Sequence, residues 1–184
     1  MSPPKLSKAA LLLVDVINDM DFPEGGKLLK HALPAAKRLA ALKARLRKLG
    51  VPAIYVNDNF GDWQSDFRQQ VERCGGDGSR GCGVTRLLAP GEDDSFILKP
   101  RHSGFYCTSL DVLLSELGTQ TLILTGFAAD ICILYTANDA YMRDFSLIVA
   151  SDCVASETLP KKRVALDHIR HRLKARVCQS RSIC

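Results

Sequence analysis

The chain has 184 residues, a net charge of +5, and 46% hydrophobic and 24% charged residues. This length is enough for a full hydrophobic core, so we expect one domain over residues 1–184. No apolar run approaches the ~20 residues that cross a bilayer, and no signal-peptide pattern precedes the first apolar segment. These features argue against a membrane-spanning protein and predict a cytoplasmic one.

The first half of the chain is predicted to contain two strands and a helix, followed by a long connection. A continuous apolar run predicts a strand over 9–14. Leucines at helical spacing predict a helix over 34–49, and a second strand follows over 52–56. The stretch 57–95 is rich in glycine, with one short helix expected over 65–73. Connections of this length are usually functional or mobile.

The second half alternates short apolar runs with segments of helical spacing. In chain order we predict a strand, a helix, a strand, a helix, a strand and a helix, over 96–98, 109–117, 121–125, 131–142, 147–150 and 161–175. The strands are apolar throughout and do not alternate with polar residues. That pattern is typical of a parallel sheet with both faces covered by helices, so the predicted fold class is α/β.

Most of the excess positive charge lies between residues 161 and 181. No aromatic residues interleave with these lysines and arginines, so we interpret them as a solvated basic helix and tail. We therefore expect neither a nucleic acid nor a membrane as a partner. The seven cysteines are odd in number and form no CxxC motif, which predicts free thiols and no disulfide framework.

Three chemically distinct polar residues follow three of the predicted strands. Asp15 ends the first strand, Lys99 ends the strand over 96–98, and Cys132 lies just beyond the strand over 121–125, in the first turn of a helix. Ligands of open α/β sheets bind outside the carboxyl ends of the strands. We therefore expect these three side chains to converge at one edge of the sheet.

An acid, an ammonium and a thiol together can form a nucleophilic site. A free thiol has a pKa of ~8.5, so it needs a base or a nearby positive charge to become an effective nucleophile at neutral pH. Asp15 can accept the thiol proton, while Lys99 and the helix N-terminus favour the thiolate. A pair between Cys132 and His102 stays open at this stage. Each residue also has a plain structural interpretation, as a loop cap, a solvated strand end or a packed thiol.

Four stretches carry a resemblance to a known family: "LLLVDVINDM", "YVNDNFGDWQSDF", "FILKPRHSGFY" and "LILTGFAADICILYTANDAYMRDF". Over roughly residues 9–155 the chain resembles the isochorismatase-like cysteine hydrolases, which include nicotinamidases and N-carbamoylsarcosine amidohydrolase. The resemblance implies a six-stranded parallel sheet in a three-layer α/β/α sandwich. It also implies a homo-oligomer, a dimer or larger.

The same resemblance implies roles for particular residues. Asp15, Lys99 and Cys132 would form a catalytic triad. A cis peptide would join Phe127 to Ala128, and the backbone N–H groups of Ala128 and Cys132 would form an oxyanion hole.

Two departures from the family pattern bear on chemistry. Ala129 stands where the family often has Thr or Ser, so a hydroxyl is missing beside the nucleophile. Nicotinamidases carry an Asp-x-His motif where this chain has Asn57-Asp58-Asn59, and no histidine lies between His31 and His102. Because zinc requires about three protein ligands, we expect no metal and no other cofactor, which disfavours nicotinamide as the substrate.

Candidate pocket residues lie near the predicted strand ends. Asn18 could hydrogen-bond the substrate or brace the acid, and Asn59 and Trp63 could line or cover the site. Phe22 and Phe105 are candidate apolar walls. For the aromatic residues, ordinary core packing is an equally good interpretation.

The sequence thus predicts a cysteine-dependent hydrolase that cleaves a C–N bond of a small amide or carbamoyl substrate through a thioester. One alternative is an isochorismatase-type hydrolase of a vinyl ether, with Asp15 as the proton donor and Cys132 as a spectator. The other is a catalytically idle metabolite-binding or redox-sensing protein on the same fold.

Overall fold

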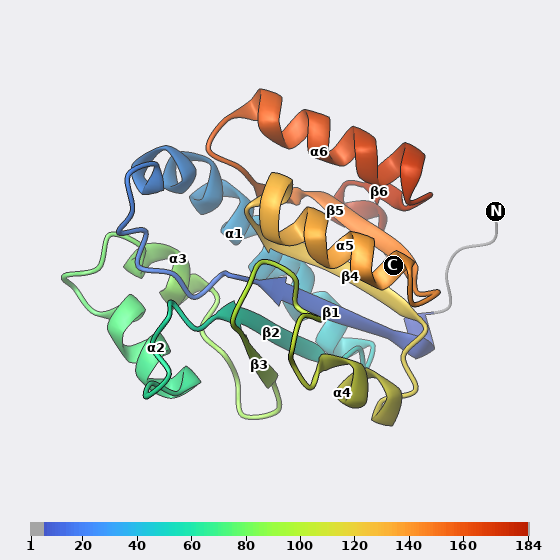
Figure 1. The fold of residues 1–184 in the computed structure, drawn as a ribbon, viewed down its shortest axis with the longest axis horizontal. Coiled ribbons are helices and arrows are strands. Elements are labelled where there is room, and N and C mark those ends of the chain that lie inside the picture. The colour runs from blue at the N-terminus through green and yellow to red at the C-terminus, as the bar shows by residue number, and fades with distance from the viewer. Residues whose placement is uncertain (1–5, 184) are drawn as a thin grey trace.

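The computed structural model describes residues 6–183, which form a six-stranded sheet with helices on both faces (Figure 1). All strand pairs are parallel, and the strand order is β3-β2-β1-β4-β5-β6. The strands are β1 (Ala9–Val14), β2 (Ala53–Asp58), β3 (Ser95–Lys99), β4 (Thr121–Phe127), β5 (Ser146–Ala155) and β6 (Arg176–Cys178).

Within residues 6–183, six α-helices connect the strands, and three shorter helical turns occur before β1, between β4 and α5, and after β6. The helices are α1 (Gly25–Lys48), α2 (Phe67–Gly75), α3 (Cys82–Leu87), α4 (Leu110–Glu116), α5 (Leu134–Tyr141) and α6 (Leu159–Arg172). The short turns are 3-10 helices at Leu6–Lys8 and Ser180–Ser182 and a π-helical turn at Ala129–Ile133. Within residues 6–183, no helix is both long and apolar enough to cross a bilayer.

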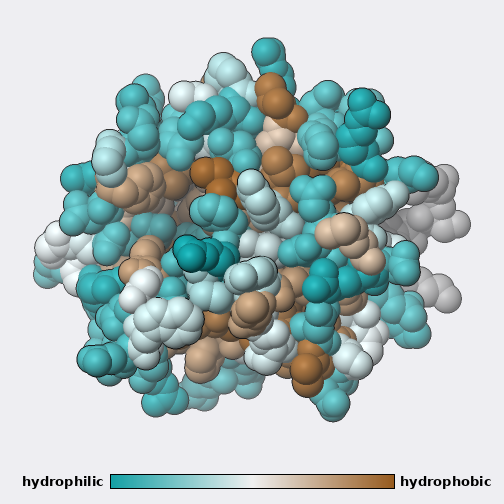
Figure 2. Space-filling view, in the orientation of Figure 1, coloured by the Kyte–Doolittle hydropathy of each residue, from teal (hydrophilic) through white to brown (hydrophobic). Residues whose placement is uncertain are grey.

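Two separate hydrophobic clusters cover the two faces of the sheet. Alternate residues of β1 belong to different clusters: Leu11 and Leu13 pack with α1, whereas Leu12 and Val14 pack with α4, α5 and α6. In Figure 1, α1 passes behind the sheet while α4, α5 and α6 lie in front. The face seen in Figure 2 is mostly hydrophilic, with hydrophobic side chains scattered in small groups. The expected three-layer α/β/α sandwich is therefore confirmed.

The predicted strands are all present, but β5 continues to Ala155, five residues beyond its predicted end at 150. The bounds of the other predicted strands differ by at most two residues. β1 has the predicted bounds because its continuous apolar run is buried on both faces. β6 was not predicted from a pattern of its own, since it has only three residues and is partly exposed. The six described cysteines are free, and Cys184 lies outside the described residues.

Two helices differ from the prediction. α1 begins at Gly25, nine residues before the predicted start at Pro34, because Leu28 and Ala32 extend its buried face. Pro34 therefore lies inside the helix, where its missing N–H removes one hydrogen bond without ending the packed face. α3 was missed altogether, since it is a six-residue helix within the glycine-rich connection.

β1 and β4 lie side by side at the centre of the sheet, and Gly126 makes their carboxyl ends fit together. Gly126 has φ +109°, and a Cβ atom there would lie 2.0 Å from the carbonyl oxygen of Val14. Only glycine tolerates both the backbone angle and the close approach.

Replacing Gly126 with alanine should therefore lower the free energy of unfolding by about 1–3 kcal/mol, the usual cost of overpacking. Denaturant unfolding of Gly126→Ala measures this. Gly26→Ala is the matched control, because nothing lies within 4 Å of a Cβ there. Gly26 is the second residue of α1, and alanine there should raise stability slightly because it restricts the unfolded chain. Equal stability of the two variants would contradict the packing argument.

Candidate active site

The polar strand-end residues meet where the connectivity of the sheet changes direction. From β1 the chain continues to β2 and β3 on one side, whereas β4, β5 and β6 lie on the other. Such a switch point leaves a crevice outside the carboxyl ends of the two central strands. Asp15 follows β1 directly, and the turn carrying Cys132 follows β4. The site residues therefore enter the crevice from neighbouring strands.

Asp15, Lys99 and Cys132 form one contact group, as expected from the sequence. Lys99 Nζ lies 2.9 Å from Asp15 Oδ2 and 3.6 Å from Cys132 Sγ. The Cys132 thiol and the Asp15 carboxylate also lie close enough for each to shift the pKa of the other. Lys99 is fully buried, Asp15 is 5% exposed, and Cys132 is partly buried. The ammonium thus contacts both the acid and the thiol, which lie on the same buried group.

The environment changes the acidity of all three groups. Burial raises the pKa of Asp15, and the charge of Lys99 and the Cys132 hydrogen bond only partly offset this. Burial and the negative charge of Asp15 raise the pKa of the Cys132 thiol, against the influence of Lys99. Burial alone would lower the pKa of Lys99, but its anionic neighbours, Asp15 foremost, raise it overall.

These directions refine the expectation that Lys99 and the helix N-terminus would favour a thiolate. In the resting site the thiol keeps its proton, because burial and Asp15 outweigh the ammonium. The raised pKa of Asp15 makes this carboxylate a stronger base than an ordinary aspartate. The geometry is therefore suited to proton transfer from Cys132 to Asp15 during attack.

Cys132 lies in the π-helical turn between β4 and α5. The peptide bond between Phe127 and Ala128 is cis, as the resemblance implied. The Ala128 carbonyl accepts hydrogen bonds from Ile131 N–H at 3.2 Å and Ile133 N–H at 3.1 Å, the residues on either side of Cys132. π-helical turns are rare and occur often at functional sites. The helical spacing over 131–142 could not distinguish this turn from a regular helix start.

Asp58 is a further member of the group that the sequence reasoning did not assign to the site. Its backbone N–H donates to Asp15 Oδ1 at 2.7 Å, and its Oδ2 lies 3.4 Å from Lys99 Nζ. Asp58 ends β2, which lies between the strands that carry Asp15 and Lys99. The available signal was its position, since the carboxyl ends of adjacent parallel strands meet at one edge.

The two asparagines beside Asp58 have structural partners. Asn57 is fully buried, and its amide donates to the Ile17 carbonyl at 2.6 Å, which fastens the segment after Asp15 to β2. Asn59 Oδ1 accepts from Gly61 N–H at 3.0 Å. Among residues 6–183, no group of three His, Cys, Asp or Glu side chains is placed to hold a metal ion. This donor set does not fit the nicotinamidase type of metal site, and metal independence remains a prediction.

The tentative pocket residues are dispersed. Asn59 and Trp63 line a hollow of about 320 Å³ beside Leu98 and Pro100, next to Lys99. Trp63 is 80% exposed, so its ring is available at the rim. Asn18 Oδ1 accepts from Met20 N–H at 2.7 Å and so braces the segment after β1.

The remaining two candidates differ in burial. Phe22 lies just before α1 and is 36% exposed. Phe105 is buried. Its ring packs against the ring of Phe145, and the Arg143 guanidinium lies over it. These contacts favour the core-packing interpretation of Phe105.

His102 has a different neighbour from the one considered in the sequence. Its ring lies 5.5 Å from the ring of Tyr135, while the thiol of Cys132 contacts Asp15 and Lys99. The contacts of residues 6–183 thus favour the Asp-Lys-Cys arrangement over a Cys-His pair.

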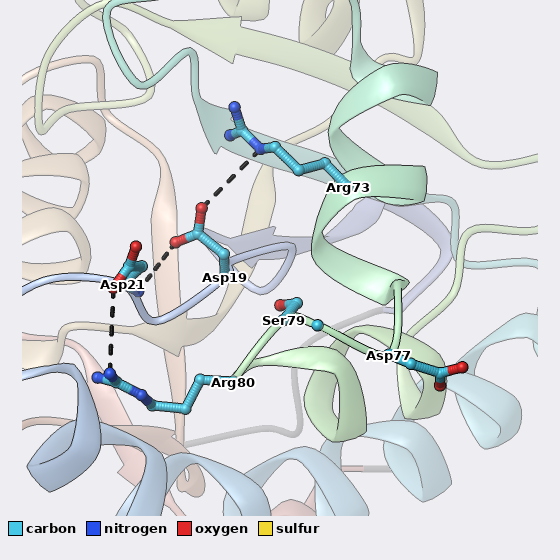
Figure 3. Close-up of a pocket in the computed structure, with 7 residues that line it drawn as sticks. Asp19, Asp21, Arg73, Asp77, Ser79 and Arg80 are labelled. Carbon is cyan, nitrogen blue, oxygen red and sulfur yellow. Dashed lines mark hydrogen bonds and ion pairs between the residues drawn. The ribbon is translucent and has the colours of Figure 1, made fainter.

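The long connection between β2 and β3 clamps the segment that follows Asp15. Gly81 N–H donates to the Asp19 carbonyl at 2.9 Å, and Arg80 Nη1 donates to the Met20 carbonyl at 3.0 Å. A cavity of about 540 Å³ lies between these segments, and Figure 3 shows Asp19 facing Arg73 and Asp21 facing Arg80 across it. In Figure 1, α2 and α3 accordingly lie beyond one end of the sheet, next to the segment from β1 to α1.

The fold and site together define a parallel α/β protein with a Cys-Asp-Lys group at its switch point, and comparison with known proteins identifies the family. The model of the isochorismatase domain matches residues 9–182. The uncharacterized isochorismatase family protein YaaI of Bacillus subtilis is 38% identical over 180 residues, covering 97% of this chain and 98% of that protein. This chain therefore belongs to the isochorismatase family and is an isochorismatase-like hydrolase.

Two other similar proteins carry names that specify an activity. The solved structure of N-carbamoylsarcosine amidase from Thermoplasma acidophilum has 30% identity and a TM-score of 0.71, and the match covers 94% of this chain and 96% of that one. Ureidoacrylate amidohydrolase RutB of Methylorubrum extorquens AM1 is 37% identical over 142 residues, covering 65% of this chain and 56% of that enzyme.

Gly81 gives a direct test of the clamp on the segment after Asp15. A Cβ atom at Gly81 would lie 1.8 Å from the Asn18 carbonyl oxygen, so Gly81→Ala must displace this segment. We expect kcat/KM to fall about a hundredfold, as small misplacements of site residues do. Gly78→Ala is the control, since a Cβ there meets nothing within 4 Å, and it should keep wild-type kinetics. Unchanged kinetics in both variants would show that the clamp does not position the site.

Proposed function

We propose that this protein is a cysteine-dependent hydrolase that cleaves a C–N bond of a small amide or carbamoyl substrate through a thioester. The observation that carries the proposal is the contact of one buried ammonium, Lys99, with both the Asp15 carboxylate at 2.9 Å and the Cys132 sulfur at 3.6 Å. Two relatives whose names specify amide or ureido chemistry support the same reaction class.

In the first half-reaction, Asp15 takes the proton of the Cys132 thiol as sulfur attacks the substrate carbonyl carbon. The carbonyl oxygen becomes an oxyanion, and the backbone N–H groups of Ala128 and Cys132 are proposed to stabilise it. Such donors are typically worth a few kcal/mol each. When the C–N bond breaks, Asp15 returns its proton to the leaving nitrogen, and a thioester to Cys132 remains.

In the second half-reaction, Asp15 again acts as the base. It removes a proton from a water molecule that attacks the thioester carbonyl carbon. Collapse of the tetrahedral intermediate breaks the C–S bond and releases the acid, and the proton returns to Cys132. Lys99 stays charged throughout because it pairs with Asp15 and Asp58. Its ammonium keeps the carboxylate and the sulfur in position.

The substrate is proposed to be a small molecule, and the hollow beside Asn59 and Trp63 is the proposed entrance. Neither a nucleic acid nor a membrane surface is proposed as a partner. We also propose that the protein acts as a homo-oligomer in the cytoplasm. Phe96 on edge strand β3 is 51% exposed and could contribute to contacts between subunits.

The covalent scheme is tested by comparing two cysteine variants in an ammonia-release screen of small amides, ureas and carbamoyl compounds. Cys132→Ala should lose turnover by at least about 10³-fold, the usual cost of removing a nucleophile. Cys82→Ala should match the wild type, because Cys82 lies on α3, outside both the contact group and the hollow proposed as the entrance. Retained turnover in Cys132→Ala would make Cys132 a spectator, as in vinyl ether hydrolysis.

The pH dependence separates a base from an acid at Asp15. As the pH falls through the raised pKa of Asp15, the carboxylate is protonated and can no longer accept the thiol proton. The acid limb of kcat/KM should therefore lie above the ordinary value of 3.8, and the raised pKa of Cys132 should remove any alkaline limb near 9.0. Turnover that increases toward low pH would instead indicate Asp15 as a proton donor.

A further inference from the structure

A second polar cavity lies away from the Asp-Lys-Cys group, at the carboxyl end of β5. It has a volume of about 440 Å³ and is lined by residues of α1, β5, the start of α6 and the segment after β6. This volume is within the range of small-molecule sites. Three of its side chains are basic: His31 and Arg38 from α1, and Lys162 from α6.

The two strongly basic side chains of this cavity, Arg38 and Lys162, have no ion-pair partner among the described residues. Neither Arg38 nor Lys162 forms an ion pair with any side chain of residues 6–183. Arg38 Nη1 only donates to the Pro34 carbonyl, at 3.3 Å. Lys162 is partly buried, although lysine side chains are rarely buried without a partner. Neighbouring Lys161 is different, since it pairs with Glu157 at 2.9 Å.

The one acidic side chain of the cavity is already engaged. Asp152 accepts from Ser180 N–H at 2.6 Å and from Ser180 Oγ at 2.9 Å. Burial lowers the pKa of Lys162, the charge of Asp152 opposes this, and Arg38 adds to the lowering. Asp152 is thus the one acidic side chain that lines the cavity, and its single charge compensates at most one of the two cations.

A buried hydroxyl also lacks a partner here. Ser156 lines the cavity and is 1% exposed, and its Oγ has no hydrogen-bond partner among the described residues. Buried polar groups in proteins are nearly always hydrogen-bonded, so an orphaned hydroxyl points to a missing ligand atom. α6 begins at the rim of the cavity, and its N-terminal dipole adds to the positive potential.

The cavity of Figure 3 differs in the pairing of its cations, although Ser79, which lines it, also has a hydroxyl without a hydrogen-bond partner among the described residues. There Arg73 lies 3.9 Å from Asp19, and Arg80 lies 4.0 Å from Asp21 and donates to the Met20 carbonyl. Its arginines therefore each form an ion pair, whereas Arg38 and Lys162 form none among residues 6–183 and share their cavity with one carboxylate, Asp152.

We propose that the cavity between α1 and α6 is a binding site for a small oxyanion, the carboxylate or phosphate group of a metabolite. Arg38 and Lys162 supply charge-assisted hydrogen bonds, and Ser156 and Gln179 supply neutral ones. The site is separate from the proposed catalytic group and does not depend on the reaction assigned to it. α6 also packs against the π-helical turn that carries Cys132, so a bound anion would contact an element that supports the catalytic thiol.

The test is calorimetric titration of the full chain with inorganic phosphate and, separately, with succinate, each at constant ionic strength maintained with KCl. The expected result is saturable binding of at least one probe. The probe that binds more tightly shows whether the site prefers a phosphate or a carboxylate. The double variant Arg38→Gln/Lys162→Gln should weaken that binding at least about tenfold, while Lys162→Arg keeps it. The matched control Lys37→Gln/Lys161→Gln removes the same charge from neighbouring positions and should bind like the wild type.

Cys132→Ala serves as a second control. It should also bind the anion like the wild type, because neither Cys132 nor its partners Asp15 and Lys99 line this cavity. Absence of saturable binding of both probes by the folded wild type would overturn the proposal. So would equal binding by the Arg38/Lys162 double variant, or loss of binding in Cys132→Ala, since each would place the anion elsewhere. Circular dichroism confirms that each variant is folded before titration.

Discussion

The ammonium of Lys99, completely enclosed at the carboxyl edge of the sheet, is the constraint on which the rest of the site depends. A buried charge is costly unless it is paired and hydrogen-bonded. Asp15 at 2.9 Å and Asp58 at 3.4 Å supply that compensation, and they arrive from the ends of β1 and β2 while Lys99 ends β3. The register of three parallel strands thus brings one cation and two carboxylates together. Removing either partner would leave charge uncompensated inside the protein.

The same arrangement determines how the thiol can react. Asp15 and burial together oppose the thiolate, and Lys99 favours it less strongly, so the pKa of Cys132 is raised. An isolated low-pKa thiolate would be reactive toward many electrophiles. Here the sulfur becomes nucleophilic only as its proton moves to Asp15. The thiol should therefore react mainly with a substrate whose carbonyl oxygen already occupies the proposed oxyanion position.

The sequence predicted the parts of the structure that depend on local patterns. β1 and the positions of Asp15, Lys99 and Cys132 followed from apolar runs that end in polar residues, because parallel strands place those ends at one edge. The roles of Asp58 and Asn57 depend on the register between strands far apart in the sequence. The clamp of Gly81 on the segment after Asp15 likewise depends on a close backbone approach that has no sequence signature.

The aromatic residues show a second limit. In the sequence, Trp63 and Phe105 are both candidate pocket residues, yet Trp63 is 80% exposed and Phe105 is 5% exposed. Packing against Phe145 and Arg143 decides the place of Phe105, and neither contact follows from spacing. The helical spacing after β4 also concealed a π-helical turn, because both helix types place similar residues on the buried face.

The central claim is that Asp15 is the base for Cys132 and not only a structural partner of Lys99. The most direct test is the pKa of the Cys132 thiol, from pH-dependent alkylation followed by mass spectrometry, in the wild type and in Asp15→Asn. Loss of the carboxylate removes a charge that raises this pKa and leaves Lys99 beside the sulfur. The account predicts a lower thiol pKa and a more reactive thiolate, together with loss of turnover. An unchanged or higher thiol pKa, or a variant that keeps its turnover, would contradict it.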